Sequence, residues 1–389
     1  MTNKKVLLIS PQPFFQWRGS PIRVGFNAMA LVANGYSVDL LTLPIGEKRE
    51  IEGVRVIRVA NPLGVKNIPI GPSLHKIIFD MLLMFKGLSL AFRNKYDVVH
   101  GIEETGIIAV MLVRLTRGRA IFEKHSDPFS YRKGFLKNCL LRVYAWVENL
   151  TVRWTDGVIG TGPGLVKQVN DMGTTTPAFH IFDIPSSLVE PKQENVDRVR
   201  KELVRNENEV LLTFVGSFAV YQGVDLLLAA IPLVVRQNPL TRFTIIGGTE
   251  KEIEERWNKL QEEGVAASVT FLGKIAPDRL PDYLAASDIL LSPRISGVNT
   301  PLKLLDYLKT GRPVVATDVV ANRLILDETT SVLTRPDPVA MAEGIASLLD
   351  DRERREMMGL NGRQLHEKKY NFVEYTKRLA ACYDHVLGR

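Results

Sequence analysis

The stretch PRISGVNTPLKLLDYLKTGRPVVATD, residues 293–318, decides the fold because it holds a loop, a helix and a strand in quick succession. Thr300 is a suitable N-cap, and Pro301 fits the first helical position, where no amide hydrogen is needed. Gly311 fits the left-handed residue that ends a helix, and the proline two residues later prevents continuation. The β-branched run over 313–316 predicts a buried parallel strand, so the stretch is typical of an α/β fold.

The first turn of this predicted helix suits an anion. Four free amides and the positive end of the helix dipole lie there, and Lys303 adds a charge, so a pyrophosphate could bind. Asp306, one turn later, could accept hydrogen bonds from sugar hydroxyls. An ordinary crossover helix with a solvated lysine and aspartate would show the same pattern, and both interpretations stay open.

Composition and cysteine count indicate an ordinary folded chain. The 389 residues predict two or three domains, and 45% apolar with 24% charged residues is typical of a globular protein with a real core. Cys139 and Cys382 form neither a disulfide framework nor a ligand pattern, which favours a reducing, cytoplasmic compartment. The apolar run in MTNKKVLLISPQ is too short for a signal peptide, and no segment approaches about 18 uncharged apolar residues, so we expect no membrane span.

The net charge of +7 belongs to the N-terminal half. Residues 1–190 hold 23 Lys and Arg against 15 Asp and Glu, a balance of +8, whereas residues 191–389 hold 27 against 28, a balance of −1. Helical patterns over 73–96 and 131–154 combine such cations with apolar side chains. They predict peripheral contact with an anionic membrane, although two sheet-covering helices with solvated basic faces are the alternative. We expect no nucleic-acid partner.

Strand-like and helix-like segments alternate along the chain. Strands are predicted at 6–10, 36–42, 54–59, 97–100, 120–124, 156–161 and 179–182, and then at 210–216, 242–247, 268–272, 289–292, 313–316 and 331–333. This βαβ series predicts two doubly wound parallel-sheet domains of similar size, with a ligand cleft at the carboxyl ends of the strands. The polar, proline-bearing residues 187–196 suit a linker between domains 1–186 and 197–370. Residues 371–389 predict a final helix.

Two glycine-bearing loops could let backbone approach a phosphate. The first, residues 16–22, contains Gly19 and Ser20, with Arg18 or Arg23 as a possible helper, although a plain turn is equally plausible. The second, FVGSFAVYQGVD at 214–225, places Gly216 at a strand end and Gly223 at a helix start. It is not a GxGxxG dinucleotide fingerprint, and it carries no cation.

His125 follows a predicted strand and could hydrogen-bond a sugar or steady a leaving group. A lone histidine in such a place is more often structural, and His100 is placed similarly with less around it. The sequence has no Ser-His-Asp order, no P-loop and no metal-ligand spacing, so we expect neither a metal nor another cofactor.

Taken together, these stretches resemble the retaining glycosyltransferases of the GT-B type, family 4 (group 1). The most specific segments are FVGSFAVYQGVDLLLAAIPLV, FTIIGG, VTFLGKIAPDRLPDYLAASDILLSPR, TPLKLLDYLKTGRPVVATD and DPVAMAEGIASLLDDRERREMMGLNGRQ, which follow one another in the family's order. ALVANGYSVDLLT and YDVVHG resemble landmarks of its first domain. The resemblance covers nearly the whole chain.

The resemblance implies two Rossmann-like domains that face a central cleft, with the nucleotide sugar bound mainly by the second domain. It implies metal-independent transfer with retained configuration, and a last helix that returns to the first domain. The glycine-rich first loop of the family matches Gly19 and Ser20, and its donor-sugar histidine matches His125. Its ribose-binding carboxylate matches Asp306, and Lys303 matches a lysine in a subset that reads PLKLFEY.

The chain departs from the family at the diphosphate loop. The usual arginine and lysine of that loop are replaced by Ser217 and Gln222, and the first motif glutamate falls at Val298. Lys303, Arg294, the helix dipole and Arg18 are the candidates to supply the missing charge. The remaining expected donor contacts come from the loop and helix start, at Gly216, Asn299, Thr300, Pro301 and Leu302.

The sequence thus predicts an enzyme that moves a hexosyl group from an NDP-sugar to a lipid-linked or polysaccharide acceptor at the cytoplasmic membrane face. His125 and Lys303 are the predicted catalytic residues. A non-catalytic relative that acts as a binding or scaffold partner in glycan assembly is the alternative, because both loop cations are lost. An NDP-sugar epimerase is a third interpretation. The base, the sugar and the acceptor stay open.

Overall fold

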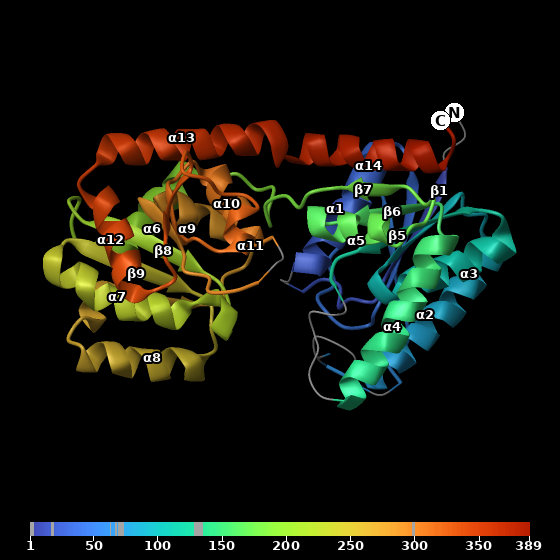
Figure 1. Cartoon of the computed structure of the whole chain (residues 1–389), viewed down its shortest axis with the longest axis horizontal. Helices are drawn as coiled ribbons and strands as arrows, with labels where there is room; N and C mark the ends of the chain where they lie inside the picture. The colour runs from blue at the N-terminus through green and yellow to red at the C-terminus, as the bar shows by residue number, and fades with distance from the viewer. Residues whose placement is uncertain are drawn as a thin grey trace. The chain divides into compact units, whose positions relative to one another are not determined.

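The computed structural model describes residues 4–16, 19–62, 64–66, 68, 74–127, 135–297 and 300–389, with the side chains of 74 and 135–140 left aside. Two compact units make up the chain (Figure 1). Unit 1 comprises Met1–Asp183 with Phe372–Arg389, and unit 2 comprises Ile184–Asn371. Each is built on one parallel sheet with helices on both faces, which confirms the predicted pair of Rossmann-like domains.

Unit 1 contains a seven-stranded sheet with the order β3-β2-β1-β4-β5-β6-β7. Its strands are β1 Lys5–Ser10, β2 Ser37–Thr42, β3 Val54–Arg58, β4 Val98–Ile102, β5 Arg119–Lys124, β6 Gly157–Gly160 and β7 Ala178–His180. Its helices are α1 Gly19–Ala33, α2 Leu74–Arg93, η1 Glu103–Thr105, α3 Gly106–Thr116, α4 Phe135–Trp154, α5 Pro163–Asp171 and α14 Phe372–Val386.

Unit 2 contains a six-stranded sheet with the order β10-β9-β8-β11-β12-β13. Its strands are β8 Val210–Val215, β9 Thr241–Ile246, β10 Val269–Gly273, β11 Ile289–Ser292, β12 Val314–Thr317 and β13 Ser331–Thr334. Its helices are α6 Gln193–Leu203, η3 Val220–Gln222, α7 Val224–Gln237, α8 Glu250–Glu262, η4 Ala266–Ser268, α9 Leu280–Ala286, α10 Leu302–Thr310, α11 Val320–Arg323, α12 Pro338–Leu349 and α13 Arg352–Lys369.

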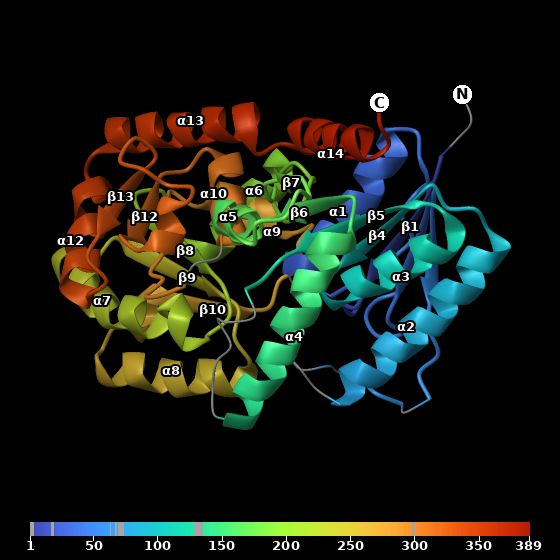
Figure 2. The ribbon, with the colours of Figure 1, turned by 45° about the vertical axis from the view of Figure 1, so that its right-hand side comes forward.

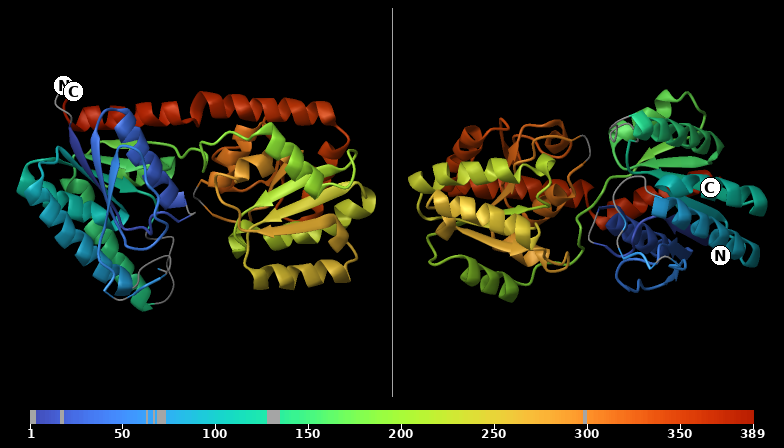
Figure 3. Two further views of the ribbon diagram at one scale, coloured as in Figure 1. Left: turned by 180° about the vertical axis from the view of Figure 1, so that it is seen from behind. Right: turned by 90° about the horizontal axis from the view of Figure 1, so that it is seen from below.

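Helices cover both faces of each sheet because the strands are apolar on both sides. In unit 1, α2 and α3 pack on one face and α1 with α14 on the other (Figure 1). In unit 2, α7, α8 and α12 share one hydrophobic core, while α6 and α9 pack together elsewhere on the sheet. Figure 3 shows α8 flanking the strands of this second sheet.

Both sheets reverse their strand order at one point, between β1 and β4 in unit 1 and between β8 and β11 in unit 2. Chains that leave neighbouring strands at such a switch point turn to opposite faces, so a crevice opens outside the carboxyl ends. The loops that follow these four strands therefore mark the best place in each unit for a ligand.

The structure corrects three boundaries. Pro301, not Thr300, precedes the helical residues of α10, with an extended backbone (ψ 107°) and no side-chain cap. The first helical bond runs from Leu304 N to Pro301 O at 3.0 Å, because the carbonyl of the residue before the helix accepts from the first turn. Gly19 and Ser20 belong to the first turn of α1 rather than to a loop. Residues 193–196, predicted as linker, are the first turn of α6.

Gly311 ends α10 as predicted, with φ of 68°.

Candidate functional site

The switch point of unit 2 brings together three segments that are distant in sequence. Gly216 follows β8, Arg294 follows β11, and Lys303 stands in the first turn of α10. Gly223 holds the loops together, because its φ is 71° and a Cβ there would approach the Pro293 carbonyl oxygen to 1.8 Å. Only glycine permits that contact, so the backbone of this site depends on it.

Lys303 has the most constrained side chain of this site. It is 9% exposed, and its Nζ lies 4.3 Å above the ring of Phe214 and donates to Gln222 Oε1 at 3.0 Å. A Cβ built on Gly216 would lie 3.5 Å from the same Nζ, so the bare glycine borders the amine. Burial lowers the pKa of Lys303 to about 7, and the nearby charge of Arg294 adds to the effect.

Arg294 is the second cation of this site. It is 8% exposed, its guanidinium lies 5.0 Å from the ring of Tyr221, and its Nε donates to Ser296 O at 2.7 Å. Burial lowers its pKa. Across the described part of the chain, neither Arg294 nor Lys303 forms an ion pair with a carboxylate. Two buried cations therefore share one place without a counter-charge, and a bound anion would offset their desolvation.

The other predicted donor-binding residues differ in how exposed they are and in whether they contact the cation pair. Gln222 is half-buried and contacts Lys303, whereas Ser217 is exposed and forms no side-chain hydrogen bond within the described residues. Thr300 and Leu302 are half-buried, and Pro301 is buried at the start of α10. The predicted contacts at Arg18, Val298 and Asn299 lie outside the described residues.

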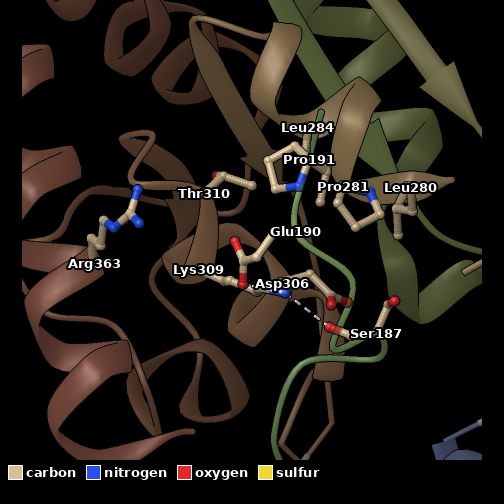
Figure 4. Close-up of a pocket in the computed structure, with 10 residues that line it drawn as sticks. All are labelled: Ser187, Glu190, Pro191, Leu280, Pro281, Leu284, Asp306, Lys309, Thr310 and Arg363. Atoms are coloured by element: carbon tan, nitrogen blue, oxygen red, sulfur yellow. Dashed lines mark hydrogen bonds and ion pairs between the residues drawn. The ribbon is translucent and has the colours of Figure 1, made fainter. Parts of the chain in front are cut away.

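Asp306 contacts a different part of unit 2, although it lies one helical turn from Lys303. Its Oδ1 accepts hydrogen bonds from Ser186 N at 2.7 Å and from Ser186 Oγ at 3.0 Å. Burial raises its pKa to about 7. It lines a small pocket together with Ser187, Lys309 and Arg363 (Figure 4). The structure therefore places Asp306 against the segment that enters unit 2.

In unit 1, the predicted pair Ser20 and His125 is in direct contact. His125 follows β5, and its Nδ1 lies 3.0 Å from Ser20 Oγ in the first turn of α1. Its Nε2 lies 2.8 Å from Oε1 of Glu123. Both ring nitrogens are thus engaged within the protein, and the His125 side chain is only 7% exposed.

Glu123, to which the sequence analysis assigned no role, is the centre of this region. Its side chain is fully buried in β5 and accepts from Arg23 Nε and from Asn27 Nδ2 at 2.7 Å. His100, inside β4 rather than after it, brings Nε2 to 2.9 Å from the same carboxylate. Burial alone would raise the pKa of Glu123, but Arg23 and the two histidines hold it well below its usual value. A charged residue within the apolar run IFEK was the available signal.

Helix α14 completes the network. Tyr375 Oη donates to Asn27 Oδ1 at 2.5 Å, and Tyr383 Oη lies 3.0 Å from His100 Nδ1. Through Asn27 and His100, both tyrosines reach Glu123. The last helix is therefore fixed to unit 1 by buried polar contacts as well as by apolar packing.

Glu103 is a second carboxylate that the sequence did not reveal. It follows β4 with a left-handed φ of 51°, which is uncommon for a residue with a side chain. Its Oε1 accepts from His125 N at 2.7 Å, and its Oε2 accepts from Ser126 Oγ at 3.2 Å and Tyr144 Oη at 3.3 Å. Burial raises its pKa. It fixes the backbone of His125.

A metal cluster and a membrane-spanning helix are both absent from the described residues, which are 4–16, 19–62, 64–66, 68, 74–127, 135–297 and 300–389. No cluster of three or more His, Cys, Asp or Glu suits a metal ion there. No helix among those residues is long and apolar enough to cross a membrane.

Comparison with known proteins gives a consistent result. Residues 19–181 match the model of the glycosyl transferase 4-like domain, and residues 209–351 match that of the glycosyl transferases group 1. An uncharacterised glycosyltransferase of Methanocaldococcus jannaschii is 24% identical over 92% of this chain and 91% of its own.

Solved structures share the fold. Sucrose-phosphate synthase from Thermosynechococcus elongatus has a TM-score of 0.79 at 21% identity, covering 99% of this chain and 100% of its own. The Anabaena protein HepE, solved in complex with UDP and glucose, has a TM-score of 0.74 at 16% identity, covering 98% and 100%.

Proposed function

The chain belongs to the group 1 glycosyltransferases, and we propose that it transfers a hexosyl group from an NDP-sugar to a lipid-linked or polysaccharide acceptor, with retention of configuration. The observation that carries the proposal is the unpaired cation pair of Lys303 and Arg294 at the switch point of unit 2. A nucleoside diphosphate would supply the negative counter-charge that these two cations lack.

The cation pair takes over the task of the missing loop cations. The loop after β8 offers only Ser217 and Gln222, but Gln222 Oε1 binds Lys303 Nζ at 3.0 Å and so holds the amine beside Gly216. Charge that develops on the departing diphosphate would be stabilised by Lys303, by Arg294 and by the amide end of α10. This arrangement needs no metal ion, because two fixed cations supply the positive charge.

Asp306 would hold the ribose with the oxygen that remains. One carboxylate oxygen is engaged by Ser186, so Oδ2 is the one available for ribose hydroxyls. Burial raises the pKa of Asp306 to about 7, and ribose hydroxyls that donate to it would favour its ionised form, because an ionised oxygen accepts stronger hydrogen bonds.

Calorimetric titration with UDP, GDP and ADP tests the donor proposal. We expect saturable binding to one nucleotide by the natural protein, loss of that binding in Lys303→Ala, and no loss in the matched control Lys259→Ala on the exposed side of α8. UDP is the first choice because HepE was solved with it. If none of the three nucleotides binds, the transferase proposal is wrong and a scaffold role becomes the better interpretation.

The acceptor side of the proposal rests on one face of unit 1. Helices α2, α3 and α4 lie side by side (Figure 2) and expose large apolar side chains. These are Ile77, Met81, Phe85, Phe92, Met111, Leu115, Val143, Trp146 and Trp154. Exposed cations on the same helices are Lys86, Arg93, Arg114, Arg142 and Arg153. We call these residues the apolar–basic face.

Such a mixture suits the headgroup region of an anionic bilayer, where apolar side chains enter the interface and cations meet the lipid phosphates. A peripheral position at the membrane would bring the enzyme to a lipid-linked acceptor. Flotation with vesicles of phosphatidylcholine, with and without phosphatidylglycerol, tests this.

We expect binding that requires the anionic lipid and falls in Phe85→Ser/Trp146→Ser. The control Val373→Ser removes an apolar residue that is even more exposed, 78% on α14 but outside the apolar–basic face, and should bind normally. Natural protein that stays unbound on anionic vesicles would rule out the membrane surface while leaving the donor proposal intact.

A further inference from the structure

The short turn η3 of unit 2 contacts both members of the cation pair. The side chain of Gln222 accepts from Lys303 Nζ at 3.0 Å, and the ring of the preceding residue, Tyr221, lies 5.0 Å from the guanidinium of Arg294. The backbone adds a third contact, because Ile295 N donates to Tyr221 O at 3.1 Å. Two consecutive residues of one loop therefore touch two cations that come from two other segments, the loop after β11 and the start of α10.

These contacts leave one side of the Lys303 amine uncovered. An ammonium group has three N–H donors. The Nζ donates to Gln222 Oε1, and it also lies 4.3 Å above the ring of Phe214, whose negative face attracts the charge. On another side the amine borders Gly216, where a Cβ would lie 3.5 Å from Nζ. A phosphate oxygen can approach from that side, because the glycine has no side chain to block it.

The guanidinium of Arg294 is held in a similar way. Tyr221 covers one of its faces, and its Nε donates to Ser296 O at 2.7 Å. Within the part of the chain that the structure describes, its two terminal nitrogens form no hydrogen bond, so their N–H groups remain for a ligand. A planar guanidinium whose face and Nε are fixed can present these groups to one phosphate in a bidentate manner.

Gln222 stands where the resemblance to the group 1 family places a lysine. Its Oε1 is 3.0 Å from Lys303 Nζ, so a lysine at position 222 would bring a second ammonium close to the first. Two like charges at such a distance in a buried place repel one another strongly, or one of them loses its proton. A glutamine avoids this conflict because its carbonyl oxygen accepts a hydrogen bond from the lysine that is already there.

We propose that Tyr221 and Gln222 are positioning residues of the diphosphate site, and that Gln222 and Lys303 form one exchangeable pair. One position of the pair must carry the cation and the other its hydrogen-bond acceptor. This inference rests on the proposed transferase function. The loop cations of the family and the pair of Lys303 and Arg294 are then alternatives, and adding one set to the other weakens the site. All four residues belong to unit 2, so the proposal concerns nucleotide binding by that unit.

The first experiment exchanges the two positions and measures affinity for the nucleotide that the donor screen identifies. Calorimetry at pH 6 keeps Lys303 protonated, since its pKa is about 7. We expect Gln222→Lys to bind at least about tenfold more weakly than the natural protein, because the two ammonium groups repel one another. Lys303→Gln should lose about 10- to 100-fold, since a hydrogen bond from a charged group is removed.

The exchange variant Gln222→Lys/Lys303→Gln should bind several-fold more tightly than either single variant, because it again holds one cation and one acceptor. The matched control Gln237→Lys adds the same charge at the exposed end of α7 and should bind like the natural protein. A Gln222→Lys variant that binds as tightly as the natural protein, or more tightly, overturns the exchangeable pair. An exchange variant that binds no more tightly than Lys303→Gln overturns it as well.

The second experiment needs no nucleotide. Proton–nitrogen spectra of the arginine side chains should show the Arg294 Nε–H resonance displaced by the ring current of Tyr221. That displacement should disappear in Tyr221→Leu and persist in Tyr221→Phe, which keeps the ring. The control Val220→Ala changes a neighbour in the same turn that is 78% exposed, and it should leave the resonance in place. A resonance that is the same in Tyr221→Leu and the natural protein overturns the positioning role of Tyr221.

Nucleotide affinity gives a second measure of Tyr221. We expect a loss of about two- to fivefold in Tyr221→Leu, the range of one cation–π contact, with most of the affinity retained in Tyr221→Phe. Both variants should melt at the temperature of the natural protein, because the Tyr221 side chain lies largely at the surface. A Tyr221→Phe variant as weak as Tyr221→Leu would contradict a role for the ring.

Failure of the two proposals can be told apart. Natural protein that binds a nucleotide, together with an exchange variant that recovers nothing, contradicts the exchangeable pair and leaves the proposed function intact. Natural protein that binds no nucleotide contradicts the proposed function and, with it, the pair. In that case the arginine spectra still decide whether Tyr221 orients Arg294.

Discussion

The two units handle buried charge in opposite ways. In unit 1, Glu123 is surrounded by donors from α1, β4 and the segment after β5. In unit 2, Lys303 and Arg294 are nearly as buried, at 9% and 8% exposed, yet neither forms an ion pair within the described residues. A buried charge with its partners in place is part of the architecture. A buried charge without a counter-charge lowers stability unless a ligand supplies one, so it marks a binding site.

The largest effect should come from breaking the complete network. Glu123→Leu leaves the charge of Arg23 and the amide of Asn27 buried without their carboxylate, which we expect to cost about 3–5 kcal/mol of unfolding free energy. Chemical denaturation followed by circular dichroism measures the loss. Glu123→Gln, which retains the shape and one acceptor, should cost clearly less. Equal stability of Glu123→Leu and the natural protein would remove the contrast between the units.

For the cation pair of unit 2 we expect the opposite result, which is no loss of stability when one charge is removed. Lys303→Met removes a buried cation that has no counter-charge, so unfolding free energy should stay constant or rise by about 1 kcal/mol. Nucleotide affinity should fall about 10- to 100-fold, since a hydrogen bond to a charged group contributes roughly 1.5–3 kcal/mol. Denaturation and calorimetry on the same preparation test both statements. A variant that loses stability without losing affinity would make Lys303 a structural residue.

The fold could be predicted from the sequence because the patterns that indicate its strands and helix ends lie within single short segments. Alternating apolar runs predicted the strands, and Gly311 predicted the end of α10 within one segment. The candidate site was only partly readable, since its contacts are not local. Ser186 and Asp306 are 120 residues apart, and Tyr375 reaches Asn27 across 348 residues. No spacing rule connects such positions, and only the charge of Glu123 within an apolar strand hinted at a buried network.

The pH dependence of nucleotide binding should distinguish Lys303 from the other charged residues of the site. Its pKa lies near 7 in the free protein, whereas a bound diphosphate favours the protonated amine. Above pH 7 binding must therefore take up a proton, and affinity should decline as pH rises, by up to tenfold per pH unit. Calorimetry in two phosphate-free buffers that differ in ionisation enthalpy measures the uptake. Lys303→Met should lose this uptake and show only the proton release expected at Asp306, and undiminished uptake there would assign the proton to another group.

Asp306 gives a second pH dependence, in stability rather than in affinity, and it too declines as pH rises. Its pKa is raised from 3.8 to about 7 in the folded state, so between these values the native chain holds a proton that the unfolded chain has lost. The contribution of Asp306 to stability is thus largest below about pH 4 and decreases as pH rises towards 7. Asp306→Asn keeps the acceptor for Ser186 and should remove that slope. An unchanged slope in urea titrations from pH 4 to 7 would contradict the assignment.

The smallest effect concerns the link between α14 and the network of unit 1. Tyr375→Phe removes the hydroxyl that donates to Asn27 Oδ1 at 2.5 Å, while Asn27 keeps its bond to Glu123. We expect a loss of about 1 kcal/mol in unfolding free energy, the typical net contribution of one hydrogen bond. Nucleotide affinity should not change, because the cation pair belongs to unit 2. A Tyr375→Phe variant with weakened nucleotide binding would show that the two charge systems are coupled.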